Sequence, residues 1–164
     1  QKVRWLALLW RTWNDRRLYG VADAILAQSP NPNPAVLDIG ANVGAFTRAF
    51  VKAGRKPRMV LAFEPSSYVF SILEIVTRRM RQVQRHKIAL SNTTGSVMLQ
   101  TPVKASGSLR VGLSHIGDDA AGDAFSESVP TRRLDDFLAD SGIDSIDVVK
   151  MDVCLLYTSD AADD

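Results

Sequence analysis

Two acidic residues and two glycines in the first half of the chain have the types and spacing of a nucleotide-cofactor site. Asp38 precedes Gly40 and Gly44, and Glu64 ends the next hydrophobic run about 20 residues later. Glycines let a backbone approach a ligand without a Cβ in the way. A carboxylate can accept hydrogen bonds from both hydroxyls of a ribose. The pattern therefore predicts a site for a ribose-containing cofactor.

The elements that position these residues follow from the hydrophobic pattern around them. An apolar run predicts a buried strand over about 35–39 that leads straight into the glycine turn. A helix is expected over about 45–53, with Gly54 as its C-terminal stop, and a second strand over about 58–63. A strand, glycine turn, helix and strand in this order form one half of a nucleotide-binding α/β sheet.

The glycine spacing distinguishes between cofactors. The dinucleotide fingerprint has three glycines and seats a pyrophosphate, but Asn42 holds the middle position here and its side chain would crowd that group. S-adenosylmethionine has no phosphate and tolerates a side chain at this point. We expect Asp38 and the turn to bind its amino-acid end, with Glu64 binding its ribose.

The chain resembles the FkbM-type S-adenosylmethionine-dependent methyltransferases over roughly residues 30–153. Five segments are similar to the family's motifs and follow its order: Asp38-Ile39-Gly40-Ala41-Asn42-Val43-Gly44; Phe63-Glu64-Pro65; Ala89-Leu90-Ser91 with Gly95; Thr131 with Leu134-Asp135-Asp136-Phe137; and Asp147-Val148-Val149-Lys150-Met151-Asp152-Val153. The resemblance implies a Rossmann-like class I methyltransferase fold. It also implies methyl transfer to a hydroxyl of a glycan or a small-molecule natural product.

Further site residues follow from that reading. Asp152 ends a predicted strand, where ligand crevices open in α/β sheets, and is the candidate general base, with His115 as the second candidate. Ser91 is a candidate for the cofactor site near the adenine. No cluster of carboxylates and histidines has metal-ligand spacing, so no metal is expected.

The remaining pattern predicts an α/β fold with a parallel sheet flanked by helices. About four core strands and a short hairpin are expected. Further helices are predicted over 18–28, 66–79 and 134–140, and Thr131 is expected to cap the last of them. Further strands are predicted over 83–90, 96–101, 129–132 and 146–153, and we expect the strand 96–101 to form a hairpin with the strand 83–90. Residues 104–128 read as a long loop.

The domain organisation follows from composition. Residues 1–29 are expected to form an N-terminal helical segment, 30–34 a Pro/Asn linker, and 35–153 a partial cofactor-binding core. Residues 154–164 leave the family pattern and read as a non-native tail. A sheet that ends there leaves a bare edge strand, so we expect an inactive fragment.

Composition sets outer limits on function. A net charge of +2 is too small to predict nucleic-acid binding, and the N-terminal apolar run is too short to span a membrane. The single cysteine, Cys154, excludes a disulfide framework and best fits a cytoplasmic location. The pattern leaves the oligomeric state open.

Each candidate has an alternative reading. Gly40 and Gly44 could serve only a tight turn and the packing of a helix on a strand, and Asp38 could cap the helix or the turn. Glu64 could be an ordinary carboxylate at the end of a strand, and Asn42 could be a turn residue that adopts positive φ. Asp152 and Lys150 could be structural, and His86 lies in a basic stretch that reads as a solvated face. An NAD(P)-dependent oxidoreductase half-domain and a non-catalytic cofactor-binding fragment remain alternative functions.

Overall fold

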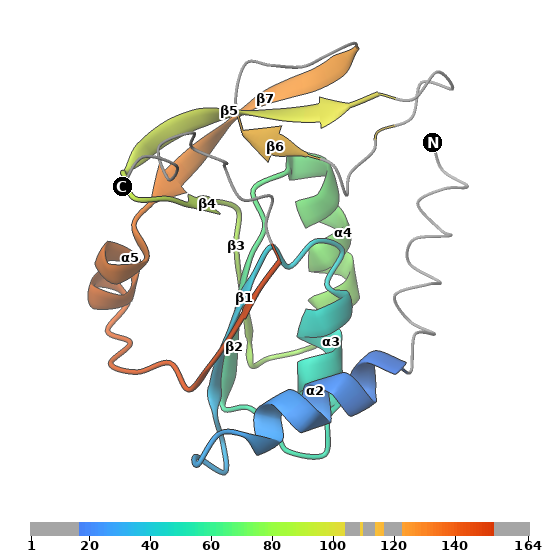
Figure 1. Ribbon diagram of the computed structural model, residues 1–164, viewed down its shortest axis with the longest axis vertical. Coiled ribbons are helices and arrows are strands. Elements are labelled where there is room, and N and C mark those ends of the chain that lie inside the picture. The colour runs from blue at the N-terminus through green and yellow to red at the C-terminus, as the bar shows by residue number, and fades with distance from the viewer. Residues whose placement is uncertain (1–16, 104–108, 110–113, 117–122, 153–164) are drawn as a thin grey trace, which may run out of the picture.

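A parallel sheet of four strands forms the centre of the fold. The computed structural model describes residues 17–103, 109, 114–116 and 123–152. The sheet has the order β3-β2-β1-β8, built from β1 (Ala35–Ile39), β2 (Met59–Phe63), β3 (Val83–His86) and β8 (Val148–Met151) (Figure 1). All three pairings are parallel, which confirms the predicted α/β class.

Helices cover both faces of this sheet. Three lie on one face, α2 (Arg17–Ala27), α3 (Ala45–Lys52) and α4 (Ser67–Thr77), and α5 (Leu134–Asp140) lies on the other (Figure 1). Successive strand residues point to opposite faces. Val36 and Val60 therefore pack in the cluster with α2, α3 and α4, whereas Leu37 and Phe63 pack with Phe137 of α5.

A second sheet follows β3 along the chain. Its order is β4-β7-β5-β6, with β4 (Ala89–Leu90), β5 (Gly95–Pro102), β6 (His115–Ile116) and β7 (Ala124–Arg132). The strands β5 and β7 are antiparallel along their whole length, and Leu99 and Val129 form a small separate core with Ala89. This sheet lies beyond the N-terminal end of α4 (Figure 1).

The second sheet corrects several expectations. The predicted strand 83–90 divides into β3 and β4, which belong to different sheets, and it forms no hairpin with 96–101. Instead β5 pairs with β6 and β7, while β4 pairs with β7 in parallel. The predicted loop 104–128 contains β6 and the first half of β7. Residues 124–128 form a mostly exposed part of that strand, so they lack the buried apolar pattern that indicates a strand.

The helix boundaries agree closely with the predicted ones, but the predicted cap of α5 is wrong. The helix α5 spans Leu134–Asp140 as expected, whereas Thr131 lies inside β7 opposite Gly95 and does not cap it. Arg133 occupies the N-cap position and makes no side-chain cap hydrogen bond. Asp135 and Asp136 in the first turn favour this helix end through its dipole.

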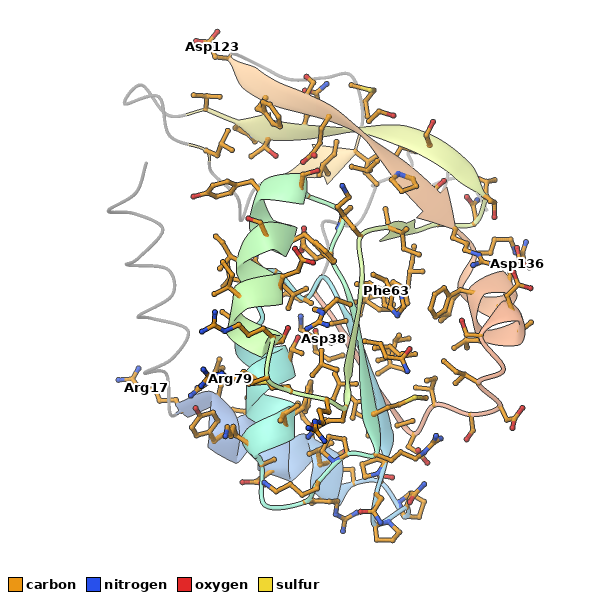
Figure 2. All side chains as sticks on the ribbon, turned by 180° about the vertical axis from the view of Figure 1, so that it is seen from behind. Arg17, Asp38, Phe63, Arg79, Asp123 and Asp136 are labelled. Carbon is orange, nitrogen blue, oxygen red and sulfur yellow. The ribbon has the colours of Figure 1, made fainter. Side chains whose placement is uncertain are left out.

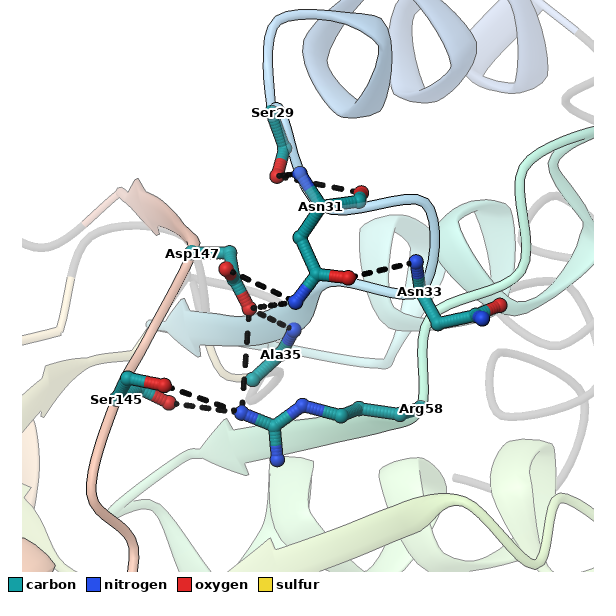
Figure 3. A network of polar contacts seen from close by, with 7 residues as sticks. All are labelled: Ser29, Asn31, Asn33, Ala35, Arg58, Ser145 and Asp147. Atoms are coloured by element: carbon teal, nitrogen blue, oxygen red, sulfur yellow. Dashed lines mark hydrogen bonds and ion pairs between the residues drawn. The ribbon is translucent and has the colours of Figure 1, made fainter.

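A polar network fixes the Pro/Asn segment to the amino end of the sheet (Figure 3). Asp147, just before β8, accepts hydrogen bonds from the Ala35 backbone N–H at 2.7 Å and from Asn31 Nδ2 at 3.2 Å. Arg58 Nη2 lies 3.9 Å from the same carboxylate and donates to the Ser145 carbonyl. The starts of β1, β2 and β8 are thereby tied together at the edge opposite Gly40.

The N-terminal and C-terminal predictions are only partly covered by the structure. The helix α2 packs on α3, and its Ala22 and Leu26 are fully buried in the cluster beside the sheet. Residues 1–16 of the expected N-terminal helical segment and the tail 154–164 lie outside the described residues.

Candidate functional site

The strand order places the candidate site residues at one edge of the sheet. On one side of β1 lie β2 and then β3, in the order of the chain, and on the other side of β1 lies β8. Ligands of such sheets bind outside the carboxyl ends of the strands, at the point where this order reverses. Asp38 and Lys150 each lie one residue before the end of β1 and β8, and Gly40, Glu64 and Asp152 each directly follow a strand, so all five lie at this edge.

The glycine turn has three residues with positive φ, namely Gly40 (69°), Asn42 (51°) and Gly44 (84°). A Cβ on Gly44 would lie 2.8 Å from Leu73 Cδ1, so this glycine permits α3 and α4 to pack closely. Asn42 therefore holds the positive-φ position considered for it, and its Oδ1 accepts the Val43 N–H at 2.7 Å.

Every backbone N–H from Ala41 to Gly44 is used within the protein. The Ala41 N–H donates to the Phe63 carbonyl at 2.9 Å, and the Gly44 N–H donates to the Ala41 carbonyl at 2.9 Å. The Asn42 N–H donates to Glu64 Oε2 at 3.0 Å. The turn therefore lacks the ring of outward N–H donors that seats a phosphate.

Glu64 is buried and joins the end of β2 to the turn. Its Oε2 accepts the Asn42 N–H and its Oε1 accepts the Ser66 N–H, each at 3.0 Å. Burial raises the pKa of the Glu64 carboxyl above its ordinary value, and these two hydrogen bonds and the Lys150 charge partly offset that rise. Each carboxylate oxygen keeps a further lone pair with which to accept a ligand hydroxyl.

Asp38 is a fully buried carboxylate on the face of the sheet toward α3. Figure 2 shows it on the opposite side of the sheet from Phe63. Its Oδ2 accepts the Thr47 hydroxyl at 2.6 Å, and its Oδ1 forms an ion pair with Lys150 Nζ at 3.0 Å. Among the described residues, no other group donates to Oδ1.

Lys150 is the functional candidate that the sequence reading weighted least. It lies in register with Asp38, so parallel pairing puts both side chains on the same face. Its side chain is 11% exposed, and Nζ donates to the Gly40 carbonyl at 2.9 Å. Nζ also lies 5.4 Å from the centre of the Phe46 ring. The contact depends on the register between β1 and β8, which no local pattern in the sequence indicates.

The two proposed catalytic residues differ in how they are placed. Asp152 lies at the site, with its side chain 80% exposed and its Oδ2 4.0 Å from Lys150 Nζ. Its backbone N–H donates to the Ile39 carbonyl at 3.0 Å, which fixes its position next to β1. His115 is in β6 of the second sheet, where its backbone pairs with Gln100. The His115 side chain lies outside the described part of the structure.

Ser91 follows β4 and is held by the second sheet. Its N–H donates to the Arg132 carbonyl at 3.0 Å, and its hydroxyl donates to Asn92 Oδ1 at 3.3 Å. Neither contact joins it to Asp38 or Glu64, so its role in adenine binding stays a prediction.

His86 was predicted to lie on a solvated basic face, and the structure contradicts this. Its ring stacks on Phe63 at 4.9 Å between centroids and meets the edge of Phe137 at 4.6 Å. Its Nε2 is buried without a hydrogen-bond partner among the described residues. Burial therefore lowers the pKa of the imidazole. The partner ring on α5 is 51 residues away in the chain, so no local pattern could indicate the contact.

Glu127 of β7 connects the second sheet to the site, and nothing in the sequence pointed to it. Both of its carboxylate oxygens accept the Ser67 N–H at the start of α4, at 3.1 and 3.2 Å. A carboxylate at a helix N-terminus is favoured by the unpaired N–H groups there. The contact holds β7 close to the turn that follows Glu64.

Two classes of feature are absent from the described ranges. No group of three or more His, Cys, Asp or Glu side chains there could hold a metal ion. No described helix is both long and apolar enough to cross a membrane.

Comparison with known proteins gives one family and one curated relative. Residues 38–153 match the Methyltransferase FkbM domain. The 2-O-methyltransferase NoeI of Sinorhizobium fredii (strain NBRC 101917 / NGR234) is 28% identical over 143 residues, which are 79% of this chain and 56% of that protein. The chain thus spans about half the length of this curated relative.

Solved structures give weaker similarities. A methyltransferase FkbM from Methylobacillus flagellatus KT is 17% identical, with a TM-score of 0.47 over 74% of this chain and 26% of that one. A putative S-adenosylmethionine dependent methyltransferase from Listeria monocytogenes is 12% identical, with a TM-score of 0.32, and the match covers 73% of this chain and 81% of that one. The family match over residues 38–153 is the stronger of the two kinds of finding.

Proposed function

The chain belongs to the FkbM methyltransferase family, and we propose that its glycine-turn site binds S-adenosylmethionine for methyl transfer to a hydroxyl oxygen. The observation that carries the proposal is the polar edge formed by Asp38, the turn and Glu64. Two buried carboxylates face this edge, while the N–H groups of the turn are consumed internally. Such an edge favours hydroxyl and ammonium donors and disfavours a diphosphate.

The described residues fit the two ends of the cofactor. Glu64 is held by the Asn42 and Ser66 N–H groups and has lone pairs left for the ribose hydroxyls. Asp38 Oδ1 is a buried acceptor whose only polar partner among the described residues is Lys150 Nζ, and the Gly40 carbonyl accepts from the same Nζ. These two acceptors suit the ammonium group of the amino-acid end.

An oxidoreductase half-domain is the less favoured alternative. NAD carries a diphosphate that requires free backbone N–H groups at the turn and helix start. Here the N–H of Asn42 is committed to Glu64, and the left-handed Asn42 keeps a side chain in the turn. Two acidic side chains at the same edge add electrostatic repulsion toward a diphosphate.

The bound cofactor would supply a methyl group already activated by its sulfonium. The protein then contributes chiefly position and alignment of the acceptor oxygen. Asp152 is the proposed general base, because its exposed carboxylate lies at the end of β8 next to the site and can take the hydroxyl proton. His115 remains the second proposal for this role.

The acceptor is proposed to be a hydroxyl of a glycan or a small-molecule natural product. The name of the relative, 2-O-methyltransferase, supports oxygen as the methylated atom. The second sheet is proposed to supply acceptor contacts, since Glu127 fixes β7 beside the turn that follows Glu64.

Retention of tritium-labelled S-adenosylmethionine on the chain tests the proposal. Binding is the suitable readout, because the chain spans 56% of its curated relative and turnover depends on the whole protein. The chain should retain the label, and Glu64→Ala should lower retention at least about tenfold, as expected for the loss of charge-assisted hydrogen bonds. Glu74→Ala, an exposed glutamate of α4, is the matched control and should bind as the unchanged chain does. Equal retention by the two variants would contradict the assignment of Glu64.

A further inference from the structure

The Lys150 ammonium occupies the place at which another ammonium group would bind. Its Nζ lies 3.0 Å from Asp38 Oδ1 and 2.9 Å from the Gly40 carbonyl oxygen. These are the two acceptors that the proposed function assigns to the amino-acid end of the cofactor. Two ammonium groups cannot both bind tightly to these acceptors, because like charges in a poorly solvated site repel strongly.

The contacts of Lys150 also indicate that it can leave. Among the described residues, Lys150 Nζ at 3.0 Å is the only polar partner of buried Asp38 Oδ1, so this oxygen can accept a ligand donor once the lysine withdraws. On the solvent side, the Asp152 side chain is 80% exposed, and its Oδ2 lies 4.0 Å from Nζ. The flexible stem of a lysine can move its charge from one carboxylate to the other without losing an ion pair.

We infer that Lys150 is a placeholder for the ammonium group of the cofactor. Without ligand it neutralises buried Asp38, and on binding it yields Asp38 Oδ1 and the Gly40 carbonyl to the ligand and turns toward Asp152. The inference rests on the proposed function and adds a residue that sets specificity for a ligand with a cationic amino-acid end.

Two related ligands separate this role from a purely structural one. S-adenosylhomocysteine carries the ammonium group, whereas methylthioadenosine has the same adenosine and sulfur without the amino-acid end. Their affinities are measured by thermal unfolding of the chain and of Lys150→Met, with Lys52→Met of α3 as an exposed control with the same change of charge.

Lys150→Met should raise the affinity for S-adenosylhomocysteine relative to methylthioadenosine about tenfold, since one charge-assisted hydrogen bond no longer has a competitor. Lys52→Met should leave the ratio unchanged. In the double variant Asp38→Asn with Lys150→Met the gain should disappear, because the carboxylate that attracts the ligand ammonium is gone. An unchanged or lower ratio in Lys150→Met overturns the inference.

The test remains decisive if Lys150→Met is unfolded alone. The ligand ammonium should then replace the missing lysine, so S-adenosylhomocysteine restores a cooperative transition and methylthioadenosine does not. Failure of both ligands to restore it contradicts the inference. If the unchanged chain binds neither ligand, the proposed function itself fails and the inference falls with it. If it binds both and Lys150→Met alters both equally, only the inference fails.

Discussion

The Lys150 ammonium and the Asp38 carboxylate form a buried ion pair across β8 and β1, at directly paired positions of the parallel sheet. A buried ion pair contributes little net stability, because the cost of removing both charges from water offsets their attraction. Its location at the carboxyl end of the two strands, where the strand order reverses, fits a role in ligand binding better than a role in holding the sheet together.

Gly44→Ala should destabilise the chain by about 2–4 kcal/mol, combining left-handed backbone strain with a close contact to Leu73. Urea unfolding measures the change. Gly142→Ala has positive φ but open space around it, so it should cost about 1 kcal/mol. Gly20→Ala, inside α2 with nothing nearby, should be neutral or stabilise by up to about 1 kcal/mol. A different order of the three values would contradict the packing assigned to the turn.

The buried carboxyl of Glu64 should make the free energy of unfolding fall as pH rises from 4.5. Its pKa in the folded chain lies above the ordinary value of 4.5, so between the two values the folded state holds more protons than the unfolded state. The stabilisation is complete below pH 4.5 and is lost as pH rises through the folded pKa. Glu64→Gln cannot titrate, so its stability measured over pH 4–8 should lack this component, and parallel curves for the two proteins would refute the claim.

His86 should have the opposite effect at a higher pH. Burial against Phe63 and Phe137 lowers the pKa of its imidazole below 6.5, so the folded state resists protonation. The chain should therefore lose stability as pH falls from 6.5 toward the folded pKa. His86→Phe keeps an aromatic ring and removes the titration. Chemical denaturation at pH 5 and pH 8 should give a smaller difference for the variant, and an equal difference would place His86 in solvent.

Asp147→Ala should cost about 2 kcal/mol or more, because the Ala35 N–H and Asn31 lose their shared acceptor (Figure 3). Asp144→Ala removes an exposed carboxylate three residues earlier and should change stability by less than about 0.5 kcal/mol. Guanidinium melts of both variants measure the contrast. Since Asp147 lies at the amino end of the sheet, ligand affinity of folded Asp147→Ala should be unchanged, and a specific loss of binding would show that the two edges are coupled.

Local signals were enough to predict the half of the fold that carries the site. The run from Ala35 to Thr77 alternates hydrophobic strands with helices, and the glycines at 40, 44 and 54 mark the turns between them, so the predicted boundaries are close to those observed. The parallel sheet followed from the alternation of strands with helices. The Asp38, Gly40 and Glu64 positions lie together for the same reason.

Contacts between distant segments could not be predicted in this way. The strand β5 pairs with β6 and β7 and not with the preceding strand β4, and that choice depends on which exposed and buried faces meet in space. His86 appears basic and exposed because Arg85 and Lys87 flank it, yet α5 covers its ring. Lys150 and Glu127 likewise acquire their roles only through partners more than 50 residues away.

Calorimetric titration of the chain with S-adenosylhomocysteine and, separately, with NAD tests the central claim most directly. The edge formed by Asp38, the glycine turn and Glu64 should bind the first ligand with measurable heat and give none with the second. Glu64→Ala should abolish the heat. Heat with NAD and none with S-adenosylhomocysteine would contradict the account, because a turn whose N–H groups are already committed offers no seat for a diphosphate.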